Sequence, residues 1–270
     1  DLKYLEDKKT APIVTIKRGR DVYYTYEEDF ELNKPIITQD ESFSLVIANQ
    51  ILQQLKGFSL TKDLQRITEK LQHQINESDE EQIIFFEEQP NLKNIHYIQD
   101  LFECIKAKTV IKLQYQNYYA DNSIEKIIHP YLLKQYNQRW FLFGLDEENR
   151  RIDNSPLDRI VSFKQTLNTY NDTLLIETIN YFNDIIGVTK PIDSIPKIVS
   201  VKVNKNRVGY IATKPIHHSQ KLVEQRKNGD TVFELKIIIN KELVSTLLSF
   251  GKDVMILKPL TLKKMTEEMK

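Results

Sequence analysis

Residues 129–144 read HPYLLKQYNQRWFLFG, and this stretch decides the fold around it. Arg139, Phe141 and Phe143 alternate along it with Trp140 and Leu142, which is the period-two pattern of a β-strand with two different faces. One face is expected to fill a core, whereas the other places an arginine beside aromatic rings. Such a face suits a stacked nucleobase with a phosphate beside it. The alternative, which the chemistry alone favours, is that Arg139 is a solvated charge and that both faces only pack.

A helix and further short strands surround this stretch. Hydrophobic spacing predicts a helix that starts near Ile95, followed by strands at residues 110–115, 124–131, 140–144, near 151, and 159–163. One helix followed by five short strands is typical of a small β-barrel, which we place at residues 95–166.

The C-terminal part of the chain has a different pattern. After a bridge at residues 167–194, residues 195–270 alternate between strands and helices in the order βαββαβ, with one more helix at the end. Asn228-Gly229-Asp230 is a turn between the middle strands. This order predicts a ferredoxin-like α/β sandwich.

The N-terminal part predicts two smaller elements. Residues 1–33 read as the end of a helix followed by a hairpin with Arg18 and Arg20 at its tip. This is typical of the back half of a winged helix, although an isolated hairpin packed on the next domain fits the spacing equally well. Residues 34–94 read as two helices that form a linker or dimerisation region, the first with a capping box at Thr38–Glu41.

Composition excludes several classes of protein. The 270 residues carry 38 basic and 38 acidic side chains, so no net charge draws the whole chain to nucleic acid or to a membrane. No run approaches the roughly 18 apolar residues of a membrane span. The single cysteine, Cys104, lies on an apolar helical face and is expected to be a small core residue of a cytoplasmic protein.

The chain offers little for catalysis, metals or cofactors. It contains no HExxH, CxxC, GxSxG or glycine-rich phosphate loop. His217 and His218 are adjacent, so on a strand their rings face opposite ways and do not chelate one metal. We interpret the pair as one packed and one exposed histidine, in preference to a pH sensor. An enzyme, a metal site and a cofactor are therefore not expected.

Several segments resemble a known family of regulators. HPYLLKQYNQRWFLFG, followed by Leu157-Asp158-Arg159-Ile160, resembles the core of WYL-domain proteins, and residues 111–115 resemble the first strand of that domain. Residues 214–220 and 248–259 resemble the WCX extension that usually follows it. Residues 1–26 resemble the end of a recognition helix and a wing.

The resemblance implies an α+β protein made of a helical linker, an Sm/SH3-like WYL barrel and the WCX sandwich. It implies a cytoplasmic, homodimeric transcriptional regulator that binds duplex DNA through its winged helix, with Arg18 and Arg20 on the wing. The barrel would sense single-stranded nucleic acid or a nucleotide. Its ligand groove would be formed by Tyr115, His129, Lys134, Arg139, Phe141 and Arg159. Because the recognition helix is incomplete in these 270 residues, we expect them to bind duplex DNA only weakly.

Two positions depart from the family pattern. Phe141 replaces the middle tyrosine of the motif, and Asp153 stands where an arginine is common. Two other functions therefore remain: an accessory sensing or oligomerisation protein that does not bind DNA, and a small-metabolite sensor that uses the same groove.

Overall fold

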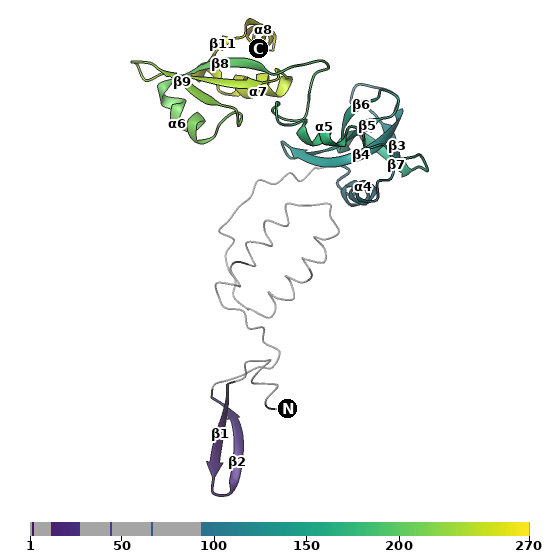
Figure 1. Cartoon of the computed structure of the whole chain (residues 1–270), viewed down its shortest axis with the longest axis vertical. Helices are drawn as coiled ribbons and strands as arrows, with labels where there is room; N and C mark the ends of the chain where they lie inside the picture. Colours follow the sequence, from purple (N-terminus) through teal and green to yellow (C-terminus); the bar gives the residue numbers. More distant parts are fainter. Residues whose placement is uncertain (1, 3–11, 28–43, 45–65, 67–92, 270) are drawn as a thin grey trace. The chain divides into compact units, whose positions relative to one another are not determined.

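The computed structural model describes residues 2, 12–27, 44, 66 and 93–269 (Figure 1). The chain divides into two compact units, residues 1–88 and 89–270, which we describe separately. In the first unit, β1 (Ile13–Arg18) and β2 (Asp21–Tyr26) form the predicted antiparallel hairpin, whose turn contains Gly19 at φ +66°. The predicted helix before this hairpin and the helical linker lie outside the described residues.

Residues 93–165 form one helix and a five-stranded antiparallel sheet with the order β6-β5-β4-β3-β7. The elements are α4 (Tyr97–Lys106), β3 (Ile111–Tyr115), β4 (Ile124–Tyr136), β5 (Arg139–Asp146), β6 (Arg151–Pro156), the 3-10 turn η1 (Leu157–Arg159) and β7 (Ile160–Gln165). The predicted helix and strands are therefore present.

The predicted barrel is not closed. Within the described residues β6 and β7 are the two edges of the sheet, and no ladder joins them. However, η1 has only three residues and connects one edge strand directly to the other. Three residues span at most about 11 Å. The two edges must therefore approach each other, and the sheet is strongly curled.

Apolar side chains fill the space between α4 and this curled sheet. Ile98, Leu101 and Cys104 lie on one face of α4 and are at most 1% exposed. Sheet residues such as Leu113 and Leu142 are equally buried. The expectation that Cys104 is a small core residue is confirmed.

The centre of the sheet depends on a close approach between β4 and β5. The pairing of these strands is irregular between Pro130 and Leu132, and next to this irregularity Gly144 lies against the backbone of β4. A Cβ atom at Gly144 would be 2.3 Å from the carbonyl oxygen of His129. Glycine is therefore required here by space and not by backbone dihedral angles.

The bridge that follows β7, residues 167–194, packs both on the curled sheet and on the C-terminal half of the second unit. It contains α5 (Leu175–Asn180) and then a segment that supplies Tyr181, Ile185 and Val188 to a small core. This core also contains Phe143 of β5 and Ile238 from the C-terminal half. We call these five residues the bridge core.

The C-terminal half has the predicted βαββαβ order, with an antiparallel sheet in the order β11-β8-β10-β9. Its elements are β8 (Lys197–Val203), α6 (Lys205–Thr213), β9 (Lys221–Gln225), β10 (Thr231–Ile237), α7 (Lys241–Ser249), the 3-10 turn η2 (Gly251–Asp253), β11 (Val254–Lys258) and α8 (Leu260–Glu268). The side chains of Asn204 and Asn240 cap α6 and α7 by accepting backbone N–H bonds. The described residues together form a mixed α+β structure.

His217 ties the bridge to the C-terminal half. Its ring is 7% exposed, its Nε2 lies 3.1 Å from the carbonyl oxygen of Asn183, and its Nδ1 lies 2.7 Å from the hydroxyl oxygen of Ser219. The hydroxyl oxygen of Ser219 in turn accepts a hydrogen bond from the backbone N–H of Lys236 in β10. The packed member of the histidine pair is therefore His217.

Protonation of His217 is expected to destabilise the fold. Burial, and secondarily the neighbouring His218, lower the pKa of His217 from its ordinary value of 6.5. The unfolded chain therefore takes up the proton first, so that the free energy of unfolding falls as the pH drops below about 6.5. Urea unfolding between pH 7.5 and 5 measures this loss. We expect His217→Gln to reduce the dependence without abolishing it, because burial also lowers the pKa of His129.

The exposed His96 offers a matched control for removing an imidazole. A pH dependence that is the same in His217→Gln as in His96→Gln would contradict this assignment.

Candidate ligand-binding site

A pocket of about 330 Å³ opens beside η1. It is lined by residues from the start of the domain, the loop after β3, η1 and β7, namely Asn94, Gln116, Asn117, Tyr118, Asp158, Arg159, Ile160 and Val161. The side-chain amide of Asn94 donates to the carbonyl oxygens of Leu157 and Ile160, at 3.0 and 2.9 Å, and thereby holds both ends of η1. Arg159 is consequently fixed at the pocket wall.

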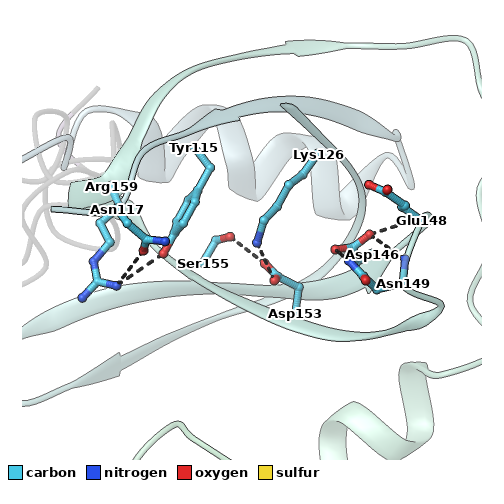
Figure 2. A network of polar contacts seen from close by, with 9 residues as sticks. All are labelled: Tyr115, Asn117, Lys126, Asp146, Glu148, Asn149, Asp153, Ser155 and Arg159. Atoms are coloured by element: carbon cyan, nitrogen blue, oxygen red, sulfur yellow. Dashed lines mark hydrogen bonds and ion pairs between the residues drawn. The ribbon is translucent and has the colours of Figure 1, made fainter. Parts of the chain in front are cut away.

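Arg159 is the central cation of this pocket. Its Nη1 lies 3.4 Å from the hydroxyl oxygen of Tyr115 and 3.4 Å from Oδ1 of Asn117 (Figure 2). The ring of Tyr118 covers the guanidinium at 5.0 Å, which is a cation–π distance. Burial, the largest single influence, lowers the pKa of Arg159, but the hydrogen bond to Tyr115 and the electrostatic attraction of Tyr115, Asp158 and Tyr118 together outweigh it, so the pKa is raised. The arginine therefore stays charged, and its buried Nε has no hydrogen-bond partner.

Asp158 connects Arg159 to a second cation. Its Oδ2 accepts a hydrogen bond from the hydroxyl of Tyr118 and lies 3.7 Å from Nη1 of Arg139. Arg139 is half exposed, whereas Oδ1 of Asp158 is buried and has no hydrogen-bond partner. The hydrogen bond to Asp158 raises the pKa of Tyr118. The pocket thus combines one arginine, one carboxylate and a tyrosine ring, and the carboxylate pairs with a second arginine, Arg139, outside the pocket lining.

An ion pair lies beside this pocket, on the other side of Tyr115. Nζ of Lys126 is 2.7 Å from Oδ1 of Asp153, and the two side chains are only 16% and 17% exposed (Figure 2). The hydroxyl of Ser155 donates to the other carboxylate oxygen at 2.6 Å. Lys126 also lies 4.5 Å from the centre of the Tyr115 ring.

This ion pair shows how an acidic residue at position 153, which departs from the family pattern, is accommodated. The carboxylate stands where the family often has an arginine, but Lys126 of β4 neutralises it across the curled sheet. Asp153 therefore does not present an unpaired negative charge to the pocket. Lys126 places a cation near Tyr115 that sequence reasoning did not identify.

The structure brings together three of the six predicted groove residues. Tyr115, Arg139 and Arg159 meet around η1, where Arg159 contacts Tyr115 directly and Arg139 is linked through Asp158. Their assignment as ligand-binding residues stays a prediction.

The other three lie elsewhere. Lys134 places its Nζ 3.6 Å from the ring centre of Phe182, and burial lowers its pKa. Phe141 is opposite Lys134 in the β4–β5 ladder and packs against the bridge core. Both side chains therefore face the bridge and not the pocket.

His129 is buried, 3% exposed, and it does not line the pocket. Its Nδ1 accepts a hydrogen bond from the backbone N–H of Asn171, and its Nε2 lies 3.6 Å from Glu147. Burial lowers the pKa of His129, although Glu147 acts in the opposite direction.

The two predicted DNA-contacting residues, Arg18 and Arg20, are exposed at the tip of the hairpin in the other unit.

Sequence reasoning missed most of the polar pocket wall. Asn94, Asn117, Tyr118 and Asp158 were not predicted, although Asp158 lies inside the recognised motif. The available signal was residues 116–123, QNYYADNS, where two tyrosines stand in an otherwise small and polar loop. Exposed aromatic residues in a loop beside an arginine are candidates for ligand contact.

The described residues give no sign of two other kinds of site. They contain no group of three or more histidine, cysteine or acidic side chains placed to hold a metal ion. None of their helices has the length and apolar character needed to span a membrane.

Comparison with known proteins matches each half of the second unit to a family model. The WYL domain matches residues 96–165, which are α4 and the curled sheet, and the WCX domain matches residues 197–269, which are the βαββαβ unit and the last helix. This chain belongs to the proteins that combine a WYL domain with a WCX domain.

Two solved structures are similar at low sequence identity. Proteasome accessory factor B/C (PafBC) of Arthrobacter aurescens is 16% identical over 62% of this chain and 25% of its own, with a TM-score of 0.28. A CRISPR Cas-related protein is 18% identical over 65% of this chain and 49% of its own, with a TM-score of 0.43. The chain thus spans less than half of either structure. No curated protein matched.

Proposed function

We propose that this chain is the sensing part of a WYL-type transcriptional regulator and that the pocket at η1 binds a nucleic-acid or nucleotide-like ligand. The observation that carries the proposal is Arg159, a charged guanidinium held at the wall of a 330 Å³ pocket beside a tyrosine ring. Pockets of about 300 Å³ and above hold small ligands. A guanidinium binds phosphate with charge-assisted hydrogen bonds along its edge, and its flat face stacks on a base.

The charges around the pocket support an anionic ligand. Arg159 lines the pocket, the half-exposed Arg139 pairs with the lining residue Asp158, and Lys126 lies on the far side of Tyr115. Asp158 and Asp153 offset part of this positive charge. The balance favours a ligand with few phosphates over a long polyanion.

The hairpin in the first unit would contact DNA, and the ligand would control this contact. Lys17, Arg18 and Arg20 are exposed at or beside its tip, where they suit contacts with the phosphates of duplex DNA. In this proposal, the ligand at the η1 pocket alters how a winged helix containing this hairpin binds its operator.

Binding of a short fluorescent single-stranded oligonucleotide tests the proposed ligand. We expect weak, salt-dependent binding, because two to three phosphate contacts correspond to a slope of log affinity against log salt of about −1.4 to −2.1. Arg159→Ala should weaken binding about 10- to 100-fold, which corresponds to the roughly 1.5–3 kcal/mol of a hydrogen bond to a charged group. Fluorescence anisotropy at low salt measures both effects.

Arg151 is a matched control, because it is an exposed arginine on β6 that does not line the pocket. Arg151→Ala should lower affinity only slightly, through the change in net charge. Equal binding by wild type and Arg159→Ala would rule out this assignment of the ligand site, and no binding by wild type at low salt would rule out single-stranded nucleic acid as its ligand.

The pocket volume also favours a second candidate, a sensor of a small metabolite. A cavity of about 330 Å³ accommodates one nucleotide-sized molecule more readily than several bases of a strand. Nucleoside monophosphates that raise the thermal midpoint, with no binding of oligonucleotides, would support this second function.

A further inference from the structure

Tyr118 makes two contacts within the ligand pocket. Its ring covers the guanidinium of Arg159 at 5.0 Å, and its hydroxyl donates to Oδ2 of Asp158. The ring of Tyr118 therefore occupies the face of Arg159 on which a flat ligand would stack. The hydroxyl of Tyr118 also binds the carboxylate of Asp158, which pairs with Arg139.

The loop that carries Tyr118 is anchored independently of these contacts. The side-chain amide of Gln116 donates to the carbonyl oxygen of Ala120 at 3.0 Å, which closes the loop on itself. The backbone N–H of Gln116 donates to the carbonyl oxygen of Arg159 at 3.0 Å. The ring of Tyr118 is thus free to move away while the base of the loop stays in place.

The closed arrangement leaves polar atoms unsatisfied. Nε of Arg159 and Oδ1 of Asp158 are both buried without a hydrogen-bond partner. Buried groups of this kind destabilise the arrangement that contains them, and they gain partners when the site opens. Tyr118 itself remains 56% exposed, so displacing it uncovers little apolar surface.

We propose that Tyr118 is an internal competitor for the ligand: its ring occupies the stacking face of Arg159 until a planar, anionic ligand displaces it. This proposal rests on the proposed function, because it concerns the same pocket. It names the ligand class as a flat heteroaromatic ring that carries a negative group. The ring replaces Tyr118 on Arg159, and the negative group replaces Asp158 as the partner of Arg139.

The neighbouring Tyr119 provides a matched control. Its side chain is fully exposed, and it is not among the residues that line the pocket. Tyr118→Ala removes both the ring and the hydroxyl, Tyr118→Phe removes only the hydroxyl, and Tyr119→Ala removes an equivalent exposed ring. None of these changes touches the core, and unchanged thermal midpoints would verify that.

The first readout does not depend on any ligand. Phenylglyoxal reacts with accessible arginine side chains, and peptide mass spectrometry measures the rate at Arg159. We expect several-fold faster modification of Arg159 in Tyr118→Ala and an unchanged rate in Tyr119→Ala. Equal rates in wild type and Tyr118→Ala would overturn the proposal.

The second readout is the affinity for the labelled oligonucleotide and for a nucleoside monophosphate. Tyr118→Phe should bind about three- to tenfold more tightly than wild type, because the hydrogen bond that holds the ring over Arg159 is lost. Tyr119→Ala should bind as wild type does. Unchanged or weaker binding by Tyr118→Phe would overturn the internal competition.

The two readouts separate this proposal from the proposed function. If Tyr118→Ala speeds modification of Arg159 but no variant binds either probe, then the nucleotide ligand is wrong while the cover on Arg159 is established. If wild type binds and the Tyr118 variants behave as Tyr119→Ala does, then the ligand is right and the internal competition is wrong.

Discussion

Phe143→Ala is expected to lower the free energy of unfolding by about 3–5 kcal/mol, the usual range for truncating a buried phenylalanine. The side chain of Phe143 is 0% exposed. Its ring makes edge contacts with Tyr181 and Phe182, with ring centres 5.6 and 4.9 Å away. Alanine would leave a cavity in the bridge core, which contains residues from the WYL sheet, the bridge and the WCX unit.

The same variant should also weaken the coupling between the two domains. Phe143 and Ile238 belong to the same small core although they come from different domains. Trp140 is the single tryptophan of the chain and lies on the same strand as Phe143, so its fluorescence reports on the WYL sheet. We expect the fluorescence transition in urea to separate from the transition seen by far-ultraviolet circular dichroism.

Tyr119→Ala is the control for this measurement, since it removes an aromatic ring that is fully exposed. Surface changes of this kind are usually within about 0.5 kcal/mol. A loss below about 1 kcal/mol in Phe143→Ala, or coincident transitions, would contradict the role assigned to the bridge core.

Gly144→Ala is the second substitution from which we expect a large loss in the free energy of unfolding. The added methyl carbon would lie 2.3 Å from the carbonyl oxygen of His129 and 2.8 Å from Cγ2 of Ile128. The carbonyl belongs to the β4–β5 ladder, in which His129 is opposite Leu145, so it cannot shift without separating the strands. Overpacking costs about 1–3 kcal/mol where side chains can adjust, and we expect at least the upper end of that range here.

Gly209 offers a control of opposite sign. It lies inside α6, and a Cβ atom there would meet no heavy atom within 4 Å. Gly209→Ala should therefore raise the free energy of unfolding, because alanine favours a helix over glycine by about 1 kcal/mol. Urea titrations of both variants measure the difference. Stability of Gly144→Ala equal to wild type would show that β4 and β5 can separate without loss.

The candidate site was only partly predictable from the sequence. The motif around residues 157–160 led to Arg159, and the family's first strand led to Tyr115. Their contact at 3.4 Å was not predictable, because it joins residues 44 positions apart. The same holds for Lys126 and Asp153, whose pairing depends on how far the sheet curls.

Alternation alone also did not predict the different surroundings of two candidate ligand residues. Arg139 and Phe141 stand two positions apart on one strand and should share a face. In the structure Arg139 reaches Asp158, whereas Phe141 packs on the bridge core. Periodicity says which residues lie on the same face, but it does not say what covers each end of that face.

The stretch at residues 129–144 by itself determined that two strands form here and that the chain resembles WYL proteins. Strand formation and helix capping depend on neighbours a few positions away, so the sequence records them directly. Only the tertiary structure decided that the sheet is curled but open, that Gly144 must lack a side chain, and that Tyr118 covers Arg159. These features depend on contacts between residues far apart along the chain, and such contacts arise only when the strands, η1 and the bridge have packed together.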